Sequence, residues 1–216
     1  MFSLWPEAAE LALLTILFFM FLFFVILRIV RHYVHFPTPS IAVPLIDNPI
    51  RRKLIQKPEQ VAERMNLKSG ITVVEIGPGS GTYTKAVAQR VLPGGRVFAV
   101  DIQEKVIRRL EGRVKREGLT NISPRIDNAY SLSFPDESVD RVLAMATLPE
   151  IPNPVSVLRE CHRILRPEGL VCLCELVFDP DYPRRKTEKR WAEEAGFKLN
   201  SEFGGFISYQ LNFEKV

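Results

Sequence analysis

The feature that most constrains this chain is an unbroken apolar run near its start. From Leu11 to Leu27 a single polar residue, Thr15, interrupts the run. A helix rises about 1.5 Å per residue, so Leu11–Val30 would span about 30 Å, the thickness of a bilayer's hydrocarbon core. The run is apolar on every side, so it lacks the polar face that a helix lying in the membrane plane needs. We therefore predict one membrane-spanning helix, with residues 1–33 as an anchor.

The charges on the two flanks predict the orientation of that helix. Glu7 and Glu10 precede the apolar run, whereas Arg28 and Arg31 follow it. The positive-inside rule then places everything after the helix in the cytoplasm, as in a single-pass membrane protein. A cleaved signal peptide is the weaker alternative, because no basic segment precedes the run and no small-residue cleavage site follows Leu27.

Five prolines occur between residues 34 and 60. Proline at this density prevents a continuous helix, so a proline-rich, basic juxtamembrane linker is predicted over residues 34–57. Two roles are open for this linker. Its basic residues can hold the following domain near anionic headgroups, or the linker can form one wall of the functional site. The first role is favoured.

Residues 58–216 show a regular alternation of apolar strands and helices, which is typical of a doubly wound α/β fold with a mostly parallel sheet. The chain has 216 residues, of which 46% are apolar, so the part after the anchor is long enough for one domain with a full core. Cys161, Cys172 and Cys174 lack metal-ligand spacing and are predicted to be reduced core residues. The predicted strands are 71–76, 96–100, 122–126, 139–146, 170–178, 197–203 and 207–213, and the predicted helices are 57–67, 82–91, 104–117, 154–165 and 186–195.

The first predicted strand leads into a glycine loop, "VVEIGPGSGTYT". The alternating glycines of Gly77–Gly81 allow a tight turn and the close approach of a ligand. A dinucleotide fingerprint would carry glycine where Thr82 stands, and a carboxylate at Glu75 would repel a pyrophosphate. Asp101, which follows the second strand, can accept hydrogen bonds from both hydroxyls of a ribose. A ligand with a ribose, a positive charge and no phosphate corresponds to S-adenosylmethionine.

Four stretches, "VVEIGPGSGTYT", "VFAVDIQ", "SFPDESVDRVLA" and "VLRECHRILRPEGLVCL", resemble in order and spacing the motifs of class I S-adenosylmethionine-dependent methyltransferases. The resemblance covers residues 58–216, the predicted methyltransferase domain. It implies a seven-stranded, Rossmann-like sheet whose last strand runs antiparallel, with S-adenosylmethionine as the cofactor. The closing stretch "GFKLNSEFGGFISYQLNFEK" fits that last hairpin.

The resemblance also implies roles for individual residues. Glu75 and the glycine loop would hold the methionine moiety, Asp101 the ribose, and Ile102 would cover the adenine. Family members usually carry an aspartate before the alanine of the loop after the third strand. Asn128 stands there in this chain, so either it or Asp127 would meet the adenine amino group. The implied cofactor-binding residues are Glu75, Gly77, Pro78, Gly79, Gly81, Asp101, Ile102, Asn128 and Ala129.

The loop after the fourth strand, "MATLPEIPNP", is expected to face the transferred methyl group. Its ionisable side chain, Glu150, is the candidate catalytic residue, either holding an acceptor ammonium or taking its proton. The alternative for Glu150 is an ordinary solvated carboxylate. The glycine loop also resembles ribosomal-RNA adenine dimethyltransferases, but "TLPE" lacks the Asn and Tyr that clamp the target base in those enzymes. A net charge of +4 does not indicate a nucleic-acid partner either, and no metal is expected.

The anchor and two basic clusters suggest the kind of substrate. The clusters are predicted to lie at the ligand edge of the sheet, where they would dock on anionic lipid. An anchored enzyme is concentrated on the surface that already holds a lipid substrate. The chain is therefore interpreted as a membrane-anchored methyltransferase of a membrane lipid, either a phospholipid headgroup amine or a prenylated quinone. The alternatives are a tethered methyltransferase of a protein or soluble small molecule, and a non-catalytic, membrane-bound cofactor-binding scaffold. The clusters consist of Arg51, Arg52 and Lys53, and of Arg184, Arg185 and Lys186.

Overall fold

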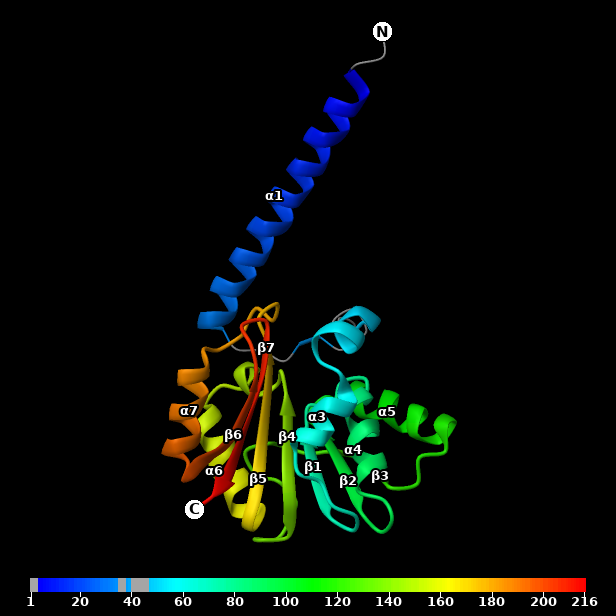
Figure 1. Cartoon of the computed structure of the whole chain (residues 1–216), viewed down its shortest axis with the longest axis vertical. Coiled ribbons are helices and arrows are strands. Elements are labelled where there is room, and N and C mark those ends of the chain that lie inside the picture. Colours follow the sequence, from blue (N-terminus) through cyan, green and yellow to red (C-terminus); the bar gives the residue numbers. More distant parts are fainter. Residues whose placement is uncertain (1–3, 35–37, 40–46) are drawn as a thin grey trace.

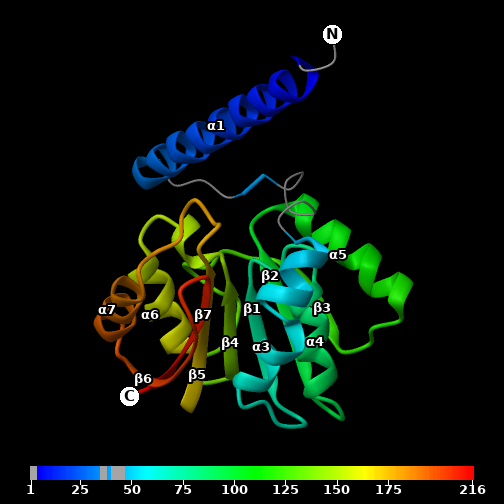
Figure 2. The same cartoon turned by 45° about the horizontal axis from the view of Figure 1, so that its top comes forward.

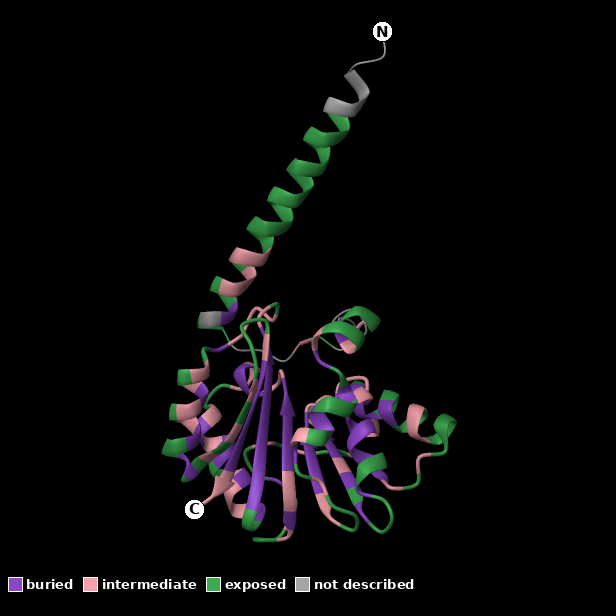
Figure 3. Cartoon of the chain, viewed as in Figure 1, coloured by how far each residue is buried: buried purple, intermediate pink, exposed green. Residues whose placement is uncertain are grey.

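The computed structural model describes residues 4–34, 38–39 and 47–216. One long helix, α1 (Leu4–Tyr33), stands on an α/β domain (Figure 1). Within the described residues, α1 holds the one segment that is long and apolar enough to cross a membrane, Ala8–Arg31, and none of its apolar window is buried (Figure 3). This is the helix predicted over Leu11–Val30, lengthened at both ends.

The domain is built on a seven-stranded sheet of order β3-β2-β1-β4-β5-β7-β6. The first five strands run parallel, whereas β7 lies antiparallel between β5 and β6. The predicted fold class, with its antiparallel last strand, is therefore confirmed. The strands are β1 (Thr72–Ile76), β2 (Arg96–Asp101), β3 (Ile122–Ile126), β4 (Val139–Met145), β5 (Leu165–Leu176), β6 (Phe197–Gly204) and β7 (Ser208–Lys215).

Helices cover both faces of the sheet and enclose two apolar layers (Figure 2). On one face lie α3 (Pro58–Arg64), α4 (Thr82–Arg90) and α5 (Glu104–Glu117); on the other lie α6 (Pro154–Ile164) and α7 (Arg185–Glu194). Cys172 and Cys174 point into the layer under α3 and α4, and Cys161 into the layer under α6. All three cysteines are buried and free, as predicted.

The strand register brings the carboxyl ends of four strands to one edge of the sheet. Ile76 of β1 pairs with Val100 of β2 and with Ala144 of β4, and Met145 pairs with Cys174 of β5. The residues that follow these strands therefore meet at the same edge, the place where open α/β sheets bind ligands. Figure 1 shows that α1 rises from this end of the domain.

Part of the predicted linker is folded onto the domain. Residues 35–37 and 40–46 lie outside the described residues, but Arg51–Ile55 forms a short π-helix, η1, which had not been predicted. Gln56 anchors this helix, because its Nε2 donates to the carbonyl of Glu175 at 2.9 Å and its own carbonyl accepts from the Tyr83 hydroxyl at 3.0 Å. Two prolines, Pro49 and Pro58, still confine the helix to little more than one turn.

The prediction that Arg51 contacts anionic lipid is wrong. Its side chain is buried, and its Nε donates to Oε1 of Gln56 at 3.0 Å. The basic run is split by the fold because η1 turns one side toward the domain and the other toward solvent. Lys53 is exposed, whereas Arg52 is half-buried and pairs with Asp47 at 3.6 Å.

Candidate active site

A cavity of about 250 Å³ opens at the carboxyl edge of the sheet. It is lined by residues that follow β1, β2, β3, β4 and β5, together with residues of the segment after α1. Apart from Gly81, every residue predicted for the site lines this cavity. These lining residues are Glu75, Gly77, Pro78, Gly79, Asp101, Ile102, Asn128, Ala129 and Glu150.

The glycine loop has the backbone shape that its sequence predicts. Gly77 and Gly81 have φ angles of 69° and 78°, in the left-handed region that favours glycine. A β-carbon on Gly77 would collide with the Thr147 side chain, and one on Gly81 would collide with Leu110. Gly81 caps the start of α4 and donates its N–H to the Pro78 carbonyl at 2.8 Å. Gly81 therefore holds the loop in its conformation, and it does not line the cavity.

Glu75 provides the test of whether the site fits S-adenosylmethionine. It lies at the end of β1 and is 1% exposed, and burial raises its pKa to about 7. Among the described residues its Oε2 has no hydrogen-bond partner. A buried acceptor of this kind fits a cationic ligand, which would supply a donor and stabilise the ionised carboxylate. The site thus suits a ligand that carries an ammonium and a sulfonium.

Asp101 and its neighbours form the part of the cavity predicted for adenosine. Asp101 accepts the Gln103 N–H at 2.8 Å through Oδ1, and burial raises its pKa. Ile102 is 63% exposed in this structure, so it is not a core residue. Its place on the cavity wall supports the prediction that it covers an aromatic base.

The alternative adenine contacts differ in what their side chains already bind. Both carboxylate oxygens of Asp127 accept hydrogen bonds from its own loop, from the N–H groups of Asn128 and Ser133 at 2.9 Å each. Asn128 uses its Oδ1 to accept from the Tyr130 N–H at 3.0 Å. Asp127 therefore caps this turn, but Asn128 also already accepts a backbone N–H through Oδ1, so both residues stay open as the contact for the adenine amino group.

Replacing Asp101 by alanine is expected to weaken S-adenosylmethionine binding by about 1–3 kcal/mol, because charge-assisted hydrogen bonds to the ribose are lost. Calorimetric titration of the purified variant measures this change. The matched control is Glu104→Ala, which removes an exposed carboxylate from the start of α5 that pairs with Arg108. An Asp101→Ala affinity equal to that of the control would refute the ribose assignment.

Glu150 is held by the segment that follows α1. It ends a short 3₁₀-helix, η2 (Leu148–Glu150), and its Oε2 accepts the Thr38 N–H at 2.8 Å, while the Thr38 hydroxyl donates to Oε1. Arg31, in the last turn of α1, pairs with Oε1 at 3.3 Å and also pairs with Asp181. Burial raises the pKa of Glu150 to about 7, although these hydrogen bonds and Arg31 lower it. Glu150 is thus a half-buried carboxylate held by three contacts, and not a solvated loop carboxylate.

Several residues that face the cavity were missed by the sequence reasoning. Thr38, Asp47 and Arg51 come from the predicted linker, and Asp179 follows β5. The Thr38 carbonyl accepts from Gln103 Nε2 at 3.2 Å, and Asp47 accepts from the Thr82 hydroxyl at 2.6 Å and from Ser80. The linker therefore forms one wall of the site, the role that had been the less favoured. The prolines of residues 34–57 indicated that this segment cannot form one continuous helix. They did not indicate which surface of the domain the segment would cover.

Comparison with known proteins gives a consistent result. Residues 74–173 match the methyltransferase domain family. The demethylmenaquinone methyltransferase of Geobacillus stearothermophilus is 35% identical over 123 residues, which are 56% of this chain and 53% of that protein. The ubiquinone/menaquinone biosynthesis C-methyltransferase UbiE of Hydrogenovibrio crunogenus is 34% identical over 114 residues, 52% of this chain and 45% of that protein. The aligned part spans about half the length of these relatives.

A solved structure shows the same fold over most of the chain. The S-adenosylmethionine-dependent methyltransferase from Aquifex aeolicus aligns with a TM-score of 0.77 and 23% identity, covering 83% of this chain and 100% of that one. Residues 74–173 thus match a methyltransferase domain, and the fold around them is that of the class I S-adenosylmethionine-dependent methyltransferases. Within that class the domain is similar to those of quinone methyltransferases, and its cofactor is S-adenosylmethionine. The roles of the individual site residues stay predictions.

Proposed function

We propose that the chain is a membrane-tethered methyltransferase that transfers a methyl group from S-adenosylmethionine to a lipid-soluble acceptor, with a prenylated quinone ring as the first candidate. The observation that carries this proposal is the ion pair between Arg31, at the end of the apolar helix, and Glu150, in the wall of the cavity. It places the cavity at the foot of a helix suited to a bilayer. The quinone is chosen because the matched relatives include demethylmenaquinone and ubiquinone/menaquinone methyltransferases.

The side chains present suit such a transfer. When bound, S-adenosylmethionine supplies an activated methyl group, so the protein has mainly to orient the acceptor and exclude water. Methylation of a hydroquinone ring carbon replaces its C–H by C–CH₃, and the ring proton must leave. Glu150, with a pKa raised to about 7, is suited to accept a proton near neutral pH. Thr38 and Arg31 hold that carboxylate in one position.

A phospholipid headgroup amine is the second candidate acceptor. The carboxylates of Asp47, Glu150 and Asp179 line the cavity in addition to the residues assigned to the cofactor. An ammonium group is a suitable partner for such a wall, and an amine also needs a proton acceptor before it can attack. This arrangement supports the amine, whereas the relatives support the quinone.

The proposal keeps the predicted organisation and orientation of the chain. Residues 1–33 act as the anchor, 34–57 as the juxtamembrane segment and 58–216 as the catalytic domain. Arg28 and Arg31 follow the apolar run, so the domain lies on the cytoplasmic side and the protein crosses the membrane once. The exposed cations Lys53, Arg184 and Lys186 remain available for anionic lipid.

The test is a methyl-transfer assay with the full-length chain in lipid vesicles and methyl-labelled S-adenosylmethionine. One set of vesicles carries a reduced demethylated menaquinone, a second carries phosphatidylethanolamine, and a third carries neither. We expect label in the quinone, and label in the amine headgroup would select the second candidate. Asp101→Ala serves as the control with impaired cofactor binding. If neither lipid acquires label, the lipid-acceptor proposal is wrong and a protein or soluble acceptor replaces it.

A further inference from the structure

The domain exposes a group of large apolar side chains on the side from which α1 rises. They come from three separate places: the turn at η1, the connection after β5, and the β6–β7 turn (Figure 1). Leu54 is 78% exposed and Phe206 is 81% exposed. Large apolar side chains that gather in the open on one side of a domain can mark an interaction surface. We name this group the apolar rim; it consists of Ile50, Leu54, Phe178, Phe206 and Ile207.

Contacts of α1 set the depth of one half of the rim. Arg28, near the end of the apolar segment, donates to the carbonyl oxygens of Asp179 and Tyr182 at 3.4 and 3.2 Å. An arginine at the end of a spanning helix lies at the boundary between acyl chains and headgroups, so the loop that it touches lies there too. In the same loop the Tyr182 hydroxyl donates to the Phe206 carbonyl at 3.2 Å. Phe206 is therefore held at the level of the bilayer surface.

The neighbouring rim residues are tied to this loop by the sheet edge. The Val177 N–H donates to the Ile207 carbonyl at 2.8 Å, which fixes the connection after β5 against the β6–β7 turn. Phe178 follows directly in the chain and is 61% exposed. Phe178, Phe206 and Ile207 thus form one apolar surface beside the foot of α1.

The other half of the rim lies on η1. In both Figure 1 and Figure 2 the axis of α1 leans over the side of the domain that carries α5 and η1. With α1 upright in a bilayer, the domain tilts and η1 rises toward the membrane. Leu54 and Ile50 are exposed there, and the exposed Lys53 stands between them in the sequence. Apolar side chains with an adjacent lysine are typical of segments that lie in the membrane interface.

Resting on the proposed membrane-spanning role of α1, we propose that the apolar rim inserts into the same leaflet and opens the cavity directly to the acyl region of the bilayer. The cavity wall and the rim are built from the same segments: Arg51 faces the cavity from η1, and Asp179 faces it one residue after Phe178. A lipid acceptor then reaches the cavity without leaving the membrane. The exposed Lys53 and Arg184 place their charges among the anionic headgroups around the rim.

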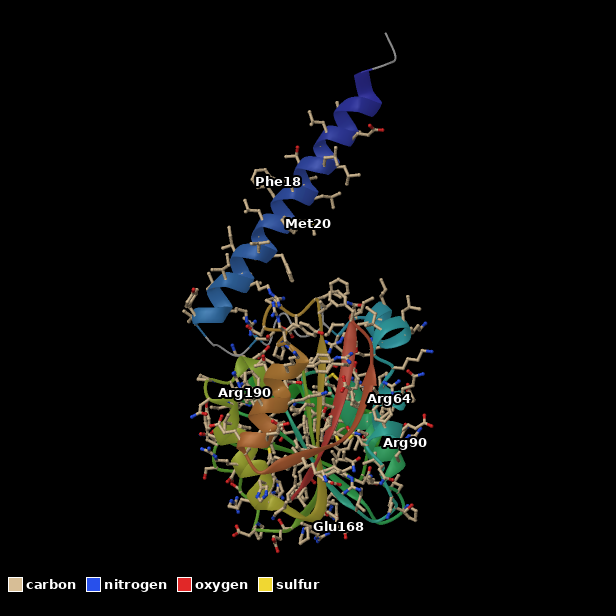
Figure 4. The ribbon with its side chains drawn as sticks, turned by 60° about the vertical axis from the view of Figure 1, so that its left-hand side comes forward. Phe18, Met20, Arg64, Arg90, Glu168 and Arg190 are labelled. Carbon is tan, nitrogen blue, oxygen red and sulfur yellow. The ribbon has the colours of Figure 1, made fainter. Side chains whose placement is uncertain are left out.

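The test measures membrane depth in the full-length chain and needs no methyl transfer. A nitroxide is attached to Leu54→Cys or to Phe206→Cys in nanodiscs of phosphatidylcholine and phosphatidylglycerol. The native cysteines are buried and do not compete for the label. The matched control is Leu92→Cys, which replaces an exposed leucine at the amino ends of the strands. Figure 4 shows that Glu168, in the first, irregular part of β5, lies at the end of the domain remote from Phe18 and Met20 of α1 and offers a polar control.

We expect the ratio of oxygen to aqueous nickel-chelate accessibility at residues 54 and 206 to exceed that at residue 92 by about fivefold or more. Ratios equal to that of residue 92 would overturn the proposal. Low accessibility to both reagents, with spin–spin broadening that disappears on dilution with unlabelled chain, would also overturn it, because a second copy would then cover the rim. If no lipid accepts a methyl group but residues 54 and 206 are found in the bilayer, the proposed function is wrong and the insertion of the apolar rim still stands.

A second measurement connects the rim to substrate supply. The paired substitution Leu54→Glu with Phe206→Glu is expected to raise KM for a vesicle-borne acceptor by about tenfold or more while leaving S-adenosylmethionine affinity unchanged. Leu92→Glu, the control, is expected to change neither quantity. An unchanged KM in the paired variant would contradict delivery of the acceptor through the rim.

Discussion

Replacing Arg31 by methionine is expected to lower kcat/KM for methyl transfer by about 100-fold at neutral pH. Arg31 is 5% exposed and is the shared counter-ion of Glu150 and Asp181. Removing one partner of a buried ion pair leaves an uncompensated buried charge and costs about 3 kcal/mol, which is about 100-fold in rate when the pair forms part of the site. Steady-state kinetics on vesicles measure the loss.

The pH dependence separates a catalytic effect from a loss of structure. Burial raises the pKa of Glu150 to about 7, and Arg31 opposes that rise. Without Arg31 the pKa rises further, so Glu150 holds its proton up to a higher pH. If Glu150 acts as a base, the acid limb of the rate profile moves to higher pH in Arg31→Met, and part of the activity returns as the pH is raised.

Arg28→Met is the matched control for this substitution. Arg28 lies one turn earlier in α1, and it donates to two backbone carbonyls instead of to Glu150. We expect a small effect on kcat/KM and no movement of the pH profile. Equal losses in the two variants, with unshifted profiles, would mean that α1 only fastens the domain and that the contact with Glu150 does not act in catalysis.

Deleting residues 1–26 is expected to lower activity on a vesicle-borne acceptor by about 100-fold or more. The deletion removes most of the apolar segment but keeps Arg28 and Arg31, so the cavity wall is retained in the sequence. The truncated chain loses the effective concentration that tethering to the substrate's own surface provides. S-adenosylmethionine affinity, measured by titration, is expected to stay nearly constant, because the predicted cofactor residues lie after residue 74.

A short-chain, water-soluble form of the same acceptor is the control for the deletion. Its turnover is expected to fall far less than that of the vesicle-borne form. If vesicle turnover is unchanged by the deletion, the helix serves localisation alone and a lipid acceptor loses its main support. If both acceptors and cofactor binding fail together, the deletion has damaged the fold, and replacing the apolar segment by an unrelated spanning helix is the informative variant.

The elements that were predicted correctly are those that depend on local sequence. An all-round apolar run of this length has to be a helix in an apolar medium, and α1 is one. The alternation of apolar strands with helices specifies a doubly wound sheet, and the glycine loop carries its own backbone requirement at Gly77 and Gly81. Even so, β5 begins at Leu165 instead of Leu170, because pairing with Val139 extends it past a bulge.

The sequence did not show which charged side chains would be buried and which would be exposed. Lys186 belongs to a basic cluster that was predicted to face anionic lipid, and Glu188 follows it two residues later in the same charged run. Lys186 is exposed, but Glu188 is buried, and burial raises the pKa of its carboxyl group. Helical periodicity turns one of these residues outward and the other inward, and only the packing of α7 on the sheet sets which is which.

The ion pair between Arg31 and Glu150 could not be predicted from the sequence for the same reason. The apolar run, the strand pattern and the glycine loop predicted one long apolar helix followed by a methyltransferase domain, because each of these features depends on a few neighbouring residues. Arg31 appeared in the sequence as a charge that orients the anchor, and Glu150 as a loop carboxylate. Their pairing, and the path of the juxtamembrane segment across the cavity, exist only in the folded chain. Partners far apart in the sequence leave no periodicity, and the free energy that joins them comes from burial that the surrounding fold creates.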